Sequence, residues 1–288
     1  MPDKDILKIS IAQISSRLAD VEKNIEKHLT YIEQAIEAGS DIIIFPELSL
    51  SGYSVKDAVY DVAMKSDDRR LRPFYEASKK ISICLGTVEL TNNYEAKNTN
   101  LFLENGLLVA RHRKVYLPTY GVYEERRYFT PGNRFRAFDS RHGRFGMLIC
   151  EDLWHPSSTS ILALDGALLI FVNSAGILRG VHQKDKPENI EIWENLNKTS
   201  AHVFTSYLVF CNRVGSEDGL MFWGGSEVVD PHGKVTAKAP YFEEYLLSAE
   251  IDLLKIKHAR VHATYLSDER LDIVCEELQR ISRAAKDY

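Results

Sequence analysis

Short apolar runs, each followed at once by polar residues, recur along this chain. Ile42–Phe45, Met147–Ile149 and Ala167–Val172 are three of them. Nearly continuous apolar runs of this length are typical of strands that are covered on both faces, as in α/β proteins. Open α/β sheets present their chemistry at the carboxyl ends of such strands. The polar residues that follow these runs are therefore the candidates for a functional site.

Amphipathic helices and hairpins separate the predicted strands. Asp20 is suited to cap a helix whose apolar residues recur at helical spacing as far as Ile36, and Gly39 is suited to end it. Further strands are predicted at Leu7–Ile14, Ile81–Val88 and Leu208–Cys211, and further helices at Asp67–Lys80, Ser157–Leu164 and Glu188–Ser206. Hairpins are predicted at Asn100–Lys114, Phe135–Ile149 and Met221–Ile251, with turns at Asn105-Gly106 and Asp230–Gly233. A long loop is predicted at Val115–Asn133 and a helical tail from Leu253 to Lys286. No internal repeat or linker divides the chain, so we expect a single α/β domain over residues 1–288, with about a dozen strands in two sheets flanked by helices.

The composition argues against several classes of partner. Hydrophobic residues make up 44% of the 288 residues, charged residues 27%, and the net charge is −5. This balance gives no basic footprint for nucleic acid or an anionic membrane. The apolar runs are too short to span a bilayer, and the first residues lack the apolar segment of a signal peptide. We therefore expect a cytoplasmic protein that binds neither nucleic acid nor membranes.

Cys150 ends the apolar run Met147–Ile149 and is the first candidate for a reactive group. Most cysteines in apolar strands are small core residues, and we expect this of Cys84, Cys211 and Cys275. A nucleophilic thiol needs a base, because at its ordinary pKa only a few per cent is thiolate at neutral pH. The four cysteines also lack metal-ligand spacing, and the chain has no glycine-rich phosphate loop, so we expect neither a metal nor a cofactor.

The residues that could serve Cys150 lie at two other strand ends. None of the nine histidines is a compelling base. His155 is close in sequence, but Pro156 follows it and the pair indicates a turn. Glu47 follows a buried run and a proline, where a carboxylate has no packing purpose, and a buried carboxylate can act as a base. Lys114 also ends a strand. On its own, Lys114 fits a solvated basic cluster better than a site, but together the three strand ends predict one site.

The three stretches around these residues resemble the nitrilase, or carbon–nitrogen hydrolase, superfamily. Phe45–Leu48, Arg113–Pro118 and Leu148–Trp154 match its Glu–Lys–Cys triad in chain order. Further matching motifs are Gly52-Tyr53, Tyr128–Gly132, Asn212–Gly215, Gly225-Ser226 and Asp230–Gly233. Within the superfamily, Cys150–Trp154 and Leu117–Glu124 look most like the glutaminase domain of glutamine-dependent NAD synthetases.

The resemblance implies a four-layer α-β-β-α sandwich and a mechanism. Cys150 would be the nucleophile, Glu47 the general base and Lys114 the stabiliser of the oxyanion, with a thioester acyl-enzyme and release of ammonia. Glu125 matches the family's second glutamate, although the neighbouring Glu124 leaves a one-residue ambiguity.

The resemblance also implies which residues contact the substrate. These are Tyr53, Tyr120, Glu151, Trp154 and Ser174, with Glu151 suited to the α-ammonium of glutamine. Tyr53 and Trp154 could equally be core aromatics.

The chain departs from the fused synthetases in one respect. The Ser-Gly-Gly-x-Asp-Ser nucleotide loop of their second domain is absent from these 288 residues. We therefore expect that this chain does not make NAD alone, and either supplies ammonia to a separate synthetase or works as a free-standing amidase. An ω-amidase, an N-carbamoyl amino acid hydrolase, a nitrilase and a non-catalytic binding or regulatory subunit are the alternatives. By analogy with the superfamily we expect a homodimer or a larger homo-oligomer.

Overall fold

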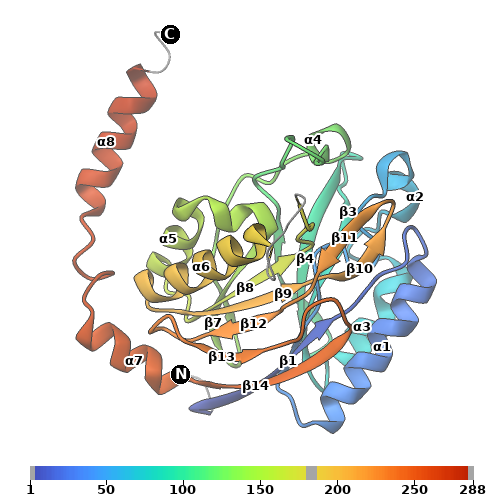
Figure 1. Cartoon of the computed structure of the whole chain (residues 1–288), viewed down its shortest axis with the longest axis horizontal. Helices are drawn as coiled ribbons and strands as arrows, with labels where there is room; N and C mark the ends of the chain where they lie inside the picture. Colours follow the sequence, from blue (N-terminus) through green and yellow to red (C-terminus); the bar gives the residue numbers. More distant parts are fainter. Residues whose placement is uncertain (1–3, 180–186, 285–288) are drawn as a thin grey trace.

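The computed structural model describes residues 4–179 and 187–284, which form two six-stranded sheets packed face to face between helices (Figure 1). The first sheet has the order β14-β1-β2-β3-β4-β5 and the second the order β13-β12-β9-β8-β7-β6. The first consists of β1 (Ile6–Gln13), β2 (Ile42–Ile44), β3 (Ser82–Leu90), β4 (Ala96–Glu104), β5 (Leu107–Arg113) and β14 (Tyr245–Asp252). The second consists of β6 (Phe138–Ser140), β7 (Gly143–Ile149), β8 (Leu169–Ser174), β9 (Tyr207–Asn212), β12 (Glu227–Val229) and β13 (Val235–Lys238). A small separate hairpin is formed by β10 (Val214–Glu217) and β11 (Leu220–Trp223).

The helices lie outside the two sheets. They are α1 (Val21–Glu37), α2 (Val59–Val62), α3 (Arg72–Ala77), α4 (Glu125–Tyr128), α5 (Pro156–Leu164), α6 (Glu188–Val203), α7 (Leu253–His262) and α8 (Leu271–Ala284). Figure 1 shows α1 and α3 against the first sheet and α5 and α6 against the second.

Alternation of side chains along the strands produces three apolar layers. On β2, Ile42 and Ile44 face the second sheet, while Ile43 faces α1. On β8, Phe171 lies between the sheets and Ile170 faces α5 and α6. Because successive side chains of a strand point to opposite faces, a strand buried on both sides needs apolar residues at every position. The predicted four-layer α-β-β-α sandwich is confirmed.

Three central strands of each sheet run in parallel: β1, β2 and β3 in one, and β7, β8 and β9 in the other. Strand β5 is antiparallel to β4, which is antiparallel to β3, so β5 points the same way as β3. The carboxyl ends of β2, β5 and β7 are the ends that precede Glu47, Lys114 and Cys150.

The local elements follow the sequence in most places. The Asp20 side chain caps α1 by accepting from the Lys23 amide, and Asn105 and Gly106 take the positive φ angles (53° and 77°) of the predicted hairpin turn. The predicted helix at residues 67–80 is wrong in extent, since only α3 is α-helical. Pro73 lacks an amide hydrogen and fits only the first turn of a helix, so the helix begins at Arg72.

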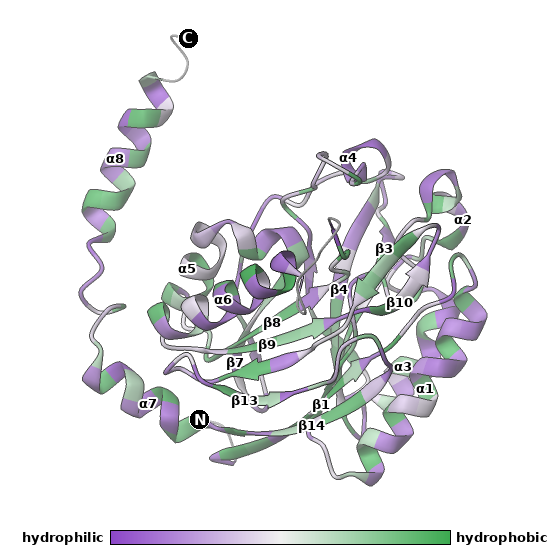
Figure 2. Cartoon of the chain, in the orientation of Figure 1, coloured by the Kyte–Doolittle hydropathy of each residue, from purple (hydrophilic) through white to green (hydrophobic). Residues whose placement is uncertain are grey.

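The tail after residue 252 is helical, as predicted, but it forms two helices. The second helix, α8, projects away from the sheets in Figure 1, and Figure 2 shows hydrophobic and hydrophilic bands along it. Its apolar side chains are exposed: Leu271, Ile273, Val274, Leu278 and Ile281. Cys275 is exposed as well, so the expectation of a core position for it is wrong, whereas Cys84 and Cys211 are buried. The predicted positions 285 and 286 lie outside the described residues.

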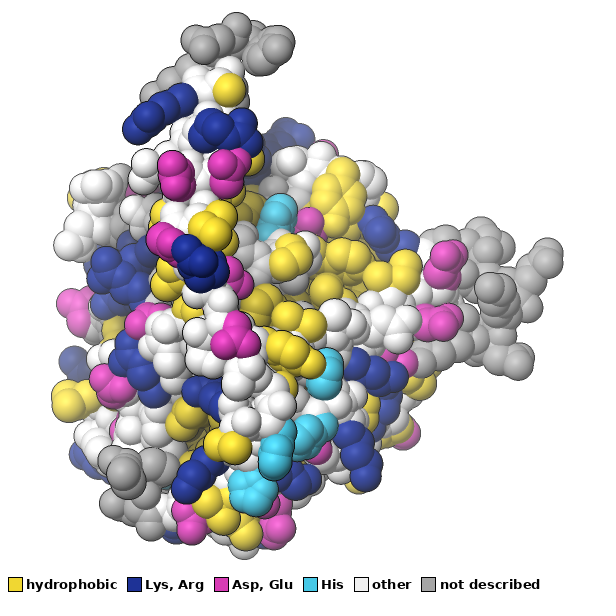
Figure 3. Space-filling model, turned by 90° about the vertical axis from the view of Figure 1, so that its left-hand side faces the viewer, with side chains coloured by type: hydrophobic (Ala, Val, Ile, Leu, Met, Phe, Trp, Pro, Cys, Tyr) yellow, Lys and Arg dark blue, Asp and Glu magenta, His cyan; other side chains and the backbone are white. Residues whose placement is uncertain are grey.

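The face that carries α8 also exposes other apolar side chains (Figure 3). Ile161 on α5 and Ile192 on α6 are 45% and 42% exposed. Within residues 4–179 and 187–284, no helix combines the length and the apolar character needed to cross a bilayer.

Gly86 on β3 lets the backbone that follows the neighbouring strand β2 approach closely, which offers a test of the packing behind Glu47. A Cβ at Gly86 would lie 2.5 Å from both the Leu48 amide nitrogen and the Pro46 carbonyl oxygen. We expect Gly86→Ala to lower the free energy of unfolding by about 1–3 kcal/mol through overpacking. Chemical denaturation measures this. Gly86 does not adopt the positive φ that disfavours alanine, so the substitution tests crowding alone, and an unchanged free energy of unfolding would contradict the packing argument.

Candidate active site

Glu47 is fully buried at the end of β2, and both of its carboxylate oxygens are engaged. Oε1 accepts hydrogen bonds from Lys114 Nζ (2.7 Å) and Asn98 Nδ2 (2.8 Å). Oε2 accepts from the backbone amide of Ala175 (2.9 Å), which follows β8 of the second sheet. A carboxylate held by three donors is oriented rather than free to rotate. The contacts with Asn98 and Ala175 could not be predicted from the amino-acid sequence, since both depend on long-range pairing.

Lys114 is buried between two carboxylates. Its Nζ lies 2.7 Å from Glu47 Oε1 and 2.7 Å from Glu125 Oε1. Burial alone would lower the pKa of Lys114, but the carboxylates of Glu125 and Glu47 outweigh that effect and raise the pKa well above its ordinary value. The side chain is therefore a fixed ammonium ion inside the protein.

Cys150 ends β7 and begins a 3₁₀ turn over Cys150–Trp154. Its φ of 45° is unusual for a residue other than glycine, and such conformations cluster at functional sites. Burial and the negative charge of Glu47 raise the pKa of the thiol well above its ordinary value, and Lys114 opposes this. The resting group is thus a neutral thiol, which can react only if a neighbour removes its proton.

Glu125 joins the site from α4, which lies in the long loop predicted at residues 115–133. Its Oε1 accepts from Lys114 and also from the Tyr53 hydroxyl (2.6 Å). It is Glu125, and not Glu124, that contacts Lys114, which resolves the one-residue ambiguity. Burial raises the pKa of Glu125 to about 7, although the contact with Lys114 opposes the shift. Its Oε2 is buried and finds no hydrogen-bond partner in the described part of the chain.

Tyr53 is nearly buried, and its hydroxyl points to the catalytic candidates. Burial, followed by the charges of Glu125 and Glu47, raises the pKa of Tyr53 well above its ordinary value. The phenol therefore stays protonated and donates its hydrogen bond to Glu125.

Asp152 is a residue that the sequence reasoning missed. Its buried carboxylate accepts from the backbone amides of Val115 and Tyr116 (3.0 Å each) and of Ile149 (3.1 Å), and it contacts His112 Nε2 at 2.7 Å. One side chain thus joins the segment after Lys114 to the segment before Cys150. In the amino-acid sequence, only its place two residues after Cys150 indicated that Asp152 belongs to the site.

The other predicted substrate contacts lie nearer the surface, except for Ser174. The Tyr120 hydroxyl donates to Glu151 Oε2 (2.9 Å), and Tyr120 is 47% exposed. Trp154 is 37% exposed and packs edge-to-face on Trp193 of α6, with ring centroids 5.2 Å apart.

Ser174 is buried at the end of β8, beside the nucleophile candidate. Its Oγ makes no hydrogen bond of ordinary geometry within the described residues, yet it lies close enough to Cys150 to lower the pKa of the thiol slightly. The site therefore consists of a buried centre and a rim in which Tyr120 and Trp154 are exposed and Glu151 is half-buried.

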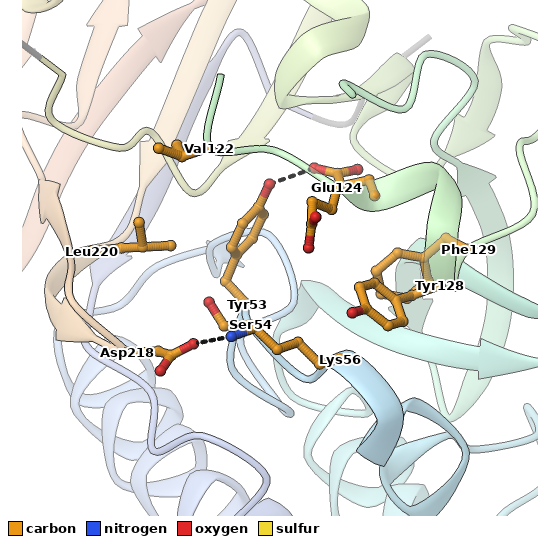
Figure 4. A pocket seen from close by; sticks show the side chains of 10 residues that line it. Tyr53, Ser54, Lys56, Val122, Glu124, Tyr128, Phe129, Asp218 and Leu220 are labelled. Atoms are coloured by element: carbon orange, nitrogen blue, oxygen red, sulfur yellow. Dashed lines mark hydrogen bonds and ion pairs between the residues drawn. The ribbon is translucent and has the colours of Figure 1, made fainter. Parts of the chain in front are cut away.

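A cavity of about 180 Å³ adjoins the buried centre from the side of Tyr53 and Glu125 (Figure 4). Lys56 and Asp218 form an ion pair of 2.5 Å at its border, and Leu220 lines it. Across residues 4–179 and 187–284 we find no group of three or more His, Cys, Asp and Glu side chains that could hold a metal ion.

The arrangement matches a known family. A sequence profile described as carbon-nitrogen hydrolase matches residues 8–261, which are most of the chain. The chain belongs to the carbon–nitrogen hydrolase family. It is therefore an enzyme that hydrolyses carbon–nitrogen bonds.

Similar proteins include both fused and single-unit members. The glutamine-dependent NAD(+) synthetase of Thermotoga maritima is 31% identical over 250 residues, which cover 86% of this chain and 42% of the synthetase. The structure of glutamine-dependent NAD+ synthetase from Acinetobacter baumannii matches with a TM-score of 0.76 and 27% identity, over 86% of this chain and 46% of that one. A carbon-nitrogen hydrolase from Helicobacter pylori G27 matches with a TM-score of 0.81 and 25% identity, over 95% and 98% of the two chains. The chain spans less than half the length of the two synthetases, and the predicted likeness to their family is confirmed.

The raised pKa of Glu125 predicts a pH dependence of stability. A carboxyl whose pKa rises from 4.5 to about 7 on folding stabilises the fold fully below pH 4.5 and loses that contribution as the pH rises to 7. Relative to Glu125→Gln, the wild-type free energy of unfolding should therefore fall between pH 4.5 and 7. Denaturant unfolding at several pH values measures the difference.

Glu89 provides a control whose contribution to stability should change with pH in the opposite direction. Burial would raise the pKa of Glu89, but its ion pairs with Arg113 (2.7 Å) and Arg111 (2.6 Å) outweigh burial and lower it. The wild type should lose stability relative to Glu89→Gln only as the pH falls below 4.5. A pH-independent difference for Glu125→Gln would contradict the assignment of a raised pKa.

Proposed function

We propose that this enzyme is a cysteine amidohydrolase that cleaves a small primary amide, with glutamine as the leading substrate. One observation carries the proposal: a buried ammonium, Lys114, bridges two buried carboxylates beside a cysteine at a strand end. The three groups supply a base, an oxyanion stabiliser and a nucleophile within one buried centre.

The first half-reaction forms a thioester. Glu47 removes the proton of the Cys150 thiol, and the thiolate attacks the amide carbonyl carbon. Lys114 stabilises the negative charge that develops on the carbonyl oxygen, an interaction whose loss in other enzymes raises the barrier by about 2.7–4 kcal/mol. The tetrahedral intermediate then expels ammonia, which takes the proton back from Glu47.

The second half-reaction releases the acid. Water donates a proton to Glu47 as its oxygen attacks the thioester carbonyl. The carbon–sulfur bond breaks, the thiolate recovers the proton, and the carboxylic acid leaves. Glu125, which holds Lys114 on the side opposite Glu47, keeps the ammonium in place through both steps.

The charges at the rim favour glutamine over a simple amide. The Glu151 carboxylate suits an α-ammonium group, and the guanidinium of Arg179 lies 5.6 Å from the Tyr120 ring centroid on the same rim. An amino acid substrate carries both complementary charges. Trp154 and Ser174 remain proposed substrate contacts, whereas the Tyr53 hydroxyl donates to Glu125.

The use of the ammonia is a further part of the proposal. The likeness to glutamine-dependent NAD synthetases supports transfer of ammonia to a separate synthetase. The match along nearly the full length of the Helicobacter pylori hydrolase favours the second candidate, a free-standing amidase. We also propose a cytoplasmic location. We further propose that the protein forms a homodimer or a larger homo-oligomer, and the exposed apolar side chains of α8 support this self-association.

The nucleophile is tested with cysteine variants. Cys150→Ala should lower ammonia release by at least about 10³-fold, because no thioester can form. Intact-mass measurement should detect an acyl adduct on the wild type and none on Cys150→Ala. Cys275→Ser is the matched control, since it removes an exposed thiol and should retain full activity. Absence of both turnover and adduct with glutamine, other amides and N-carbamoyl amino acids would support the non-catalytic alternative instead.

The substrate is tested by removing the charge of Glu151. A hydrogen bond to a charged group contributes about 1.5–3 kcal/mol, so Glu151→Gln should raise the KM for glutamine about 10- to 100-fold. The control substrate is 4-carbamoylbutanoate, which is glutamine without its amino group, and its KM should change less than about threefold. Equal changes for both substrates would contradict binding of an α-ammonium at Glu151, and preferred turnover of an N-carbamoyl amino acid would overturn glutamine as substrate.

A further inference from the structure

The loop that carries Tyr53 is held by a carboxylate from a distant part of the chain. Glu217, the last residue of β10, is only 7% exposed. Its Oε1 accepts hydrogen bonds from the backbone amides of Tyr53 (2.9 Å) and Ser54 (2.7 Å). The backbone at Tyr53 is thus fixed from the side opposite its hydroxyl.

Glu217 is itself anchored by a buried arginine. Arg213 Nη2 lies 2.6 Å from Glu217 Oε2 and donates to the Ser16 carbonyl (2.8 Å). The guanidinium also lies over the Phe222 ring, 4.4 Å from its centroid. The Tyr53 ring packs against the same Phe222 ring, with the two ring centroids 5.9 Å apart. Phe222 therefore contacts both Arg213 and Tyr53. A buried charge pair of this kind is costly to break on one side only.

Gly52, which precedes Tyr53, is required by the close approach of Glu217 to this loop. Gly52 has a φ of 82°, and a Cβ there would lie 2.6 Å from Glu217 Oε2 and 2.9 Å from Leu18 Cα. Two motifs that the proposed chemistry leaves unexplained, Gly52-Tyr53 and Asn212–Gly215, therefore meet in one cluster.

The other end of Tyr53 reaches the catalytic candidates. Its hydroxyl donates to Glu125 Oε1 (2.6 Å), and the same oxygen accepts from Lys114 Nζ (2.7 Å). A continuous series of contacts therefore runs from Arg213 through Glu217, Tyr53 and Glu125 to Lys114.

We propose that Glu217, anchored by Arg213, is a positioning residue that acts through Tyr53 to hold Glu125 on Lys114. The inference rests on the proposed Glu–Lys–Cys chemistry but not on the identity of the amide. Without the Tyr53 hydroxyl in place, Glu125 Oε1 loses one of its two donors and the carboxylate can rotate away from Lys114. Lys114 then stabilises both the thiolate and the oxyanion less well. Tyr53 is thereby assigned a role in kcat rather than in substrate affinity.

A double-mutant cycle tests whether Glu217 acts through Tyr53. Loss of a hydrogen bond to a charged group predicts that Tyr53→Phe and Glu217→Ala each lower kcat about 10-fold or more, with KM within about threefold. In the Tyr53→Phe background, Glu217→Ala should have little further effect. Full multiplication of the two losses, or a Glu217→Ala kcat equal to that of the wild type, would overturn the proposal. So would a change confined to KM.

A second variant and a control separate positioning from stability. In Glu217→Gln the amide oxygen can still accept from both backbone amides, so kcat should stay within about threefold even though the buried Arg213 loses its counter-charge. Glu227→Ala is the matched control, because Glu227 is fully buried and accepts from Lys238 (2.8 Å) and Asn197 (2.9 Å). It should lower the melting temperature without lowering kcat. If Glu217→Ala does not fold, Gly52→Ala takes its place as the disrupting variant, and a Gly52→Ala kcat equal to that of the wild type then overturns the proposal.

Thiol reactivity gives a readout that needs no substrate. Alkylation of Cys150 by iodoacetamide, followed by mass spectrometry in the Cys275→Ser background, should slow by a similar factor in Tyr53→Phe, Glu217→Ala and the double variant. If glutamine is the wrong substrate, the wild type will be inactive on glutamine while these alkylation rates still differ from the wild-type rate. If the positioning inference is wrong, the wild type will be active and the Glu217→Ala rate will equal that of the wild type.

Discussion

The ammonium of Lys114 between Glu47 and Glu125 is the interaction on which the site depends. A charge removed from water is tolerated only when opposite charges and hydrogen bonds replace the solvent. Lys114 Nζ has both, at 2.7 Å from each carboxylate. Two buried carboxylates around one ammonium leave an excess negative charge, and burial raises the pKa of Glu125 to about 7. A proton on Glu125 near neutral pH therefore brings the cluster close to overall neutrality.

The sandwich brings these groups together because polar side chains connect its two sheets near the strand ends. Asn173, at the end of β8, donates to the Phe45 carbonyl at the end of β2 (2.5 Å) and accepts from Asn100 Nδ2 (2.8 Å). The Ala175 amide reaches Glu47 from the same strand end. These contacts fix the distance between the strand end that carries Glu47 and the sheet that carries Cys150.

Local rules of sequence were enough to predict the sandwich and the positions of Glu47, Lys114 and Cys150. Apolar runs indicate the buried strands that precede Glu47 and Cys150, whereas Lys114 follows the partly exposed second strand of a predicted hairpin. Asn98 and Asp152 were not predictable, because their contacts join residues 51 and 37 positions apart and depend on how the sheets pair. The predicted extent of the helix at residues 67–80 was wrong because Pro73 fits only the first turn of a helix. The predicted core position of Cys275 was wrong because an amphipathic pattern indicates an apolar face without indicating what covers it. The choice between Glu124 and Glu125 needed the direction in which α4 faces.

The state of Cys150 explains why a base and an ammonium are both needed. A buried thiol beside a carboxylate resists ionisation, so the protein does not hold a ready thiolate. In the proposed mechanism, proton transfer to Glu47 turns a neutral thiol and an anionic base into an anionic thiolate and a neutral acid, and the negative charge stays within the buried centre. Lys114 contacts Glu47 and lowers the pKa of Cys150, so it can favour the charge in either location. The proposed mechanism next passes the charge to the carbonyl oxygen of the substrate, so one fixed ammonium suits each proposed stage, and the groups that hold Lys114 in position become part of that mechanism.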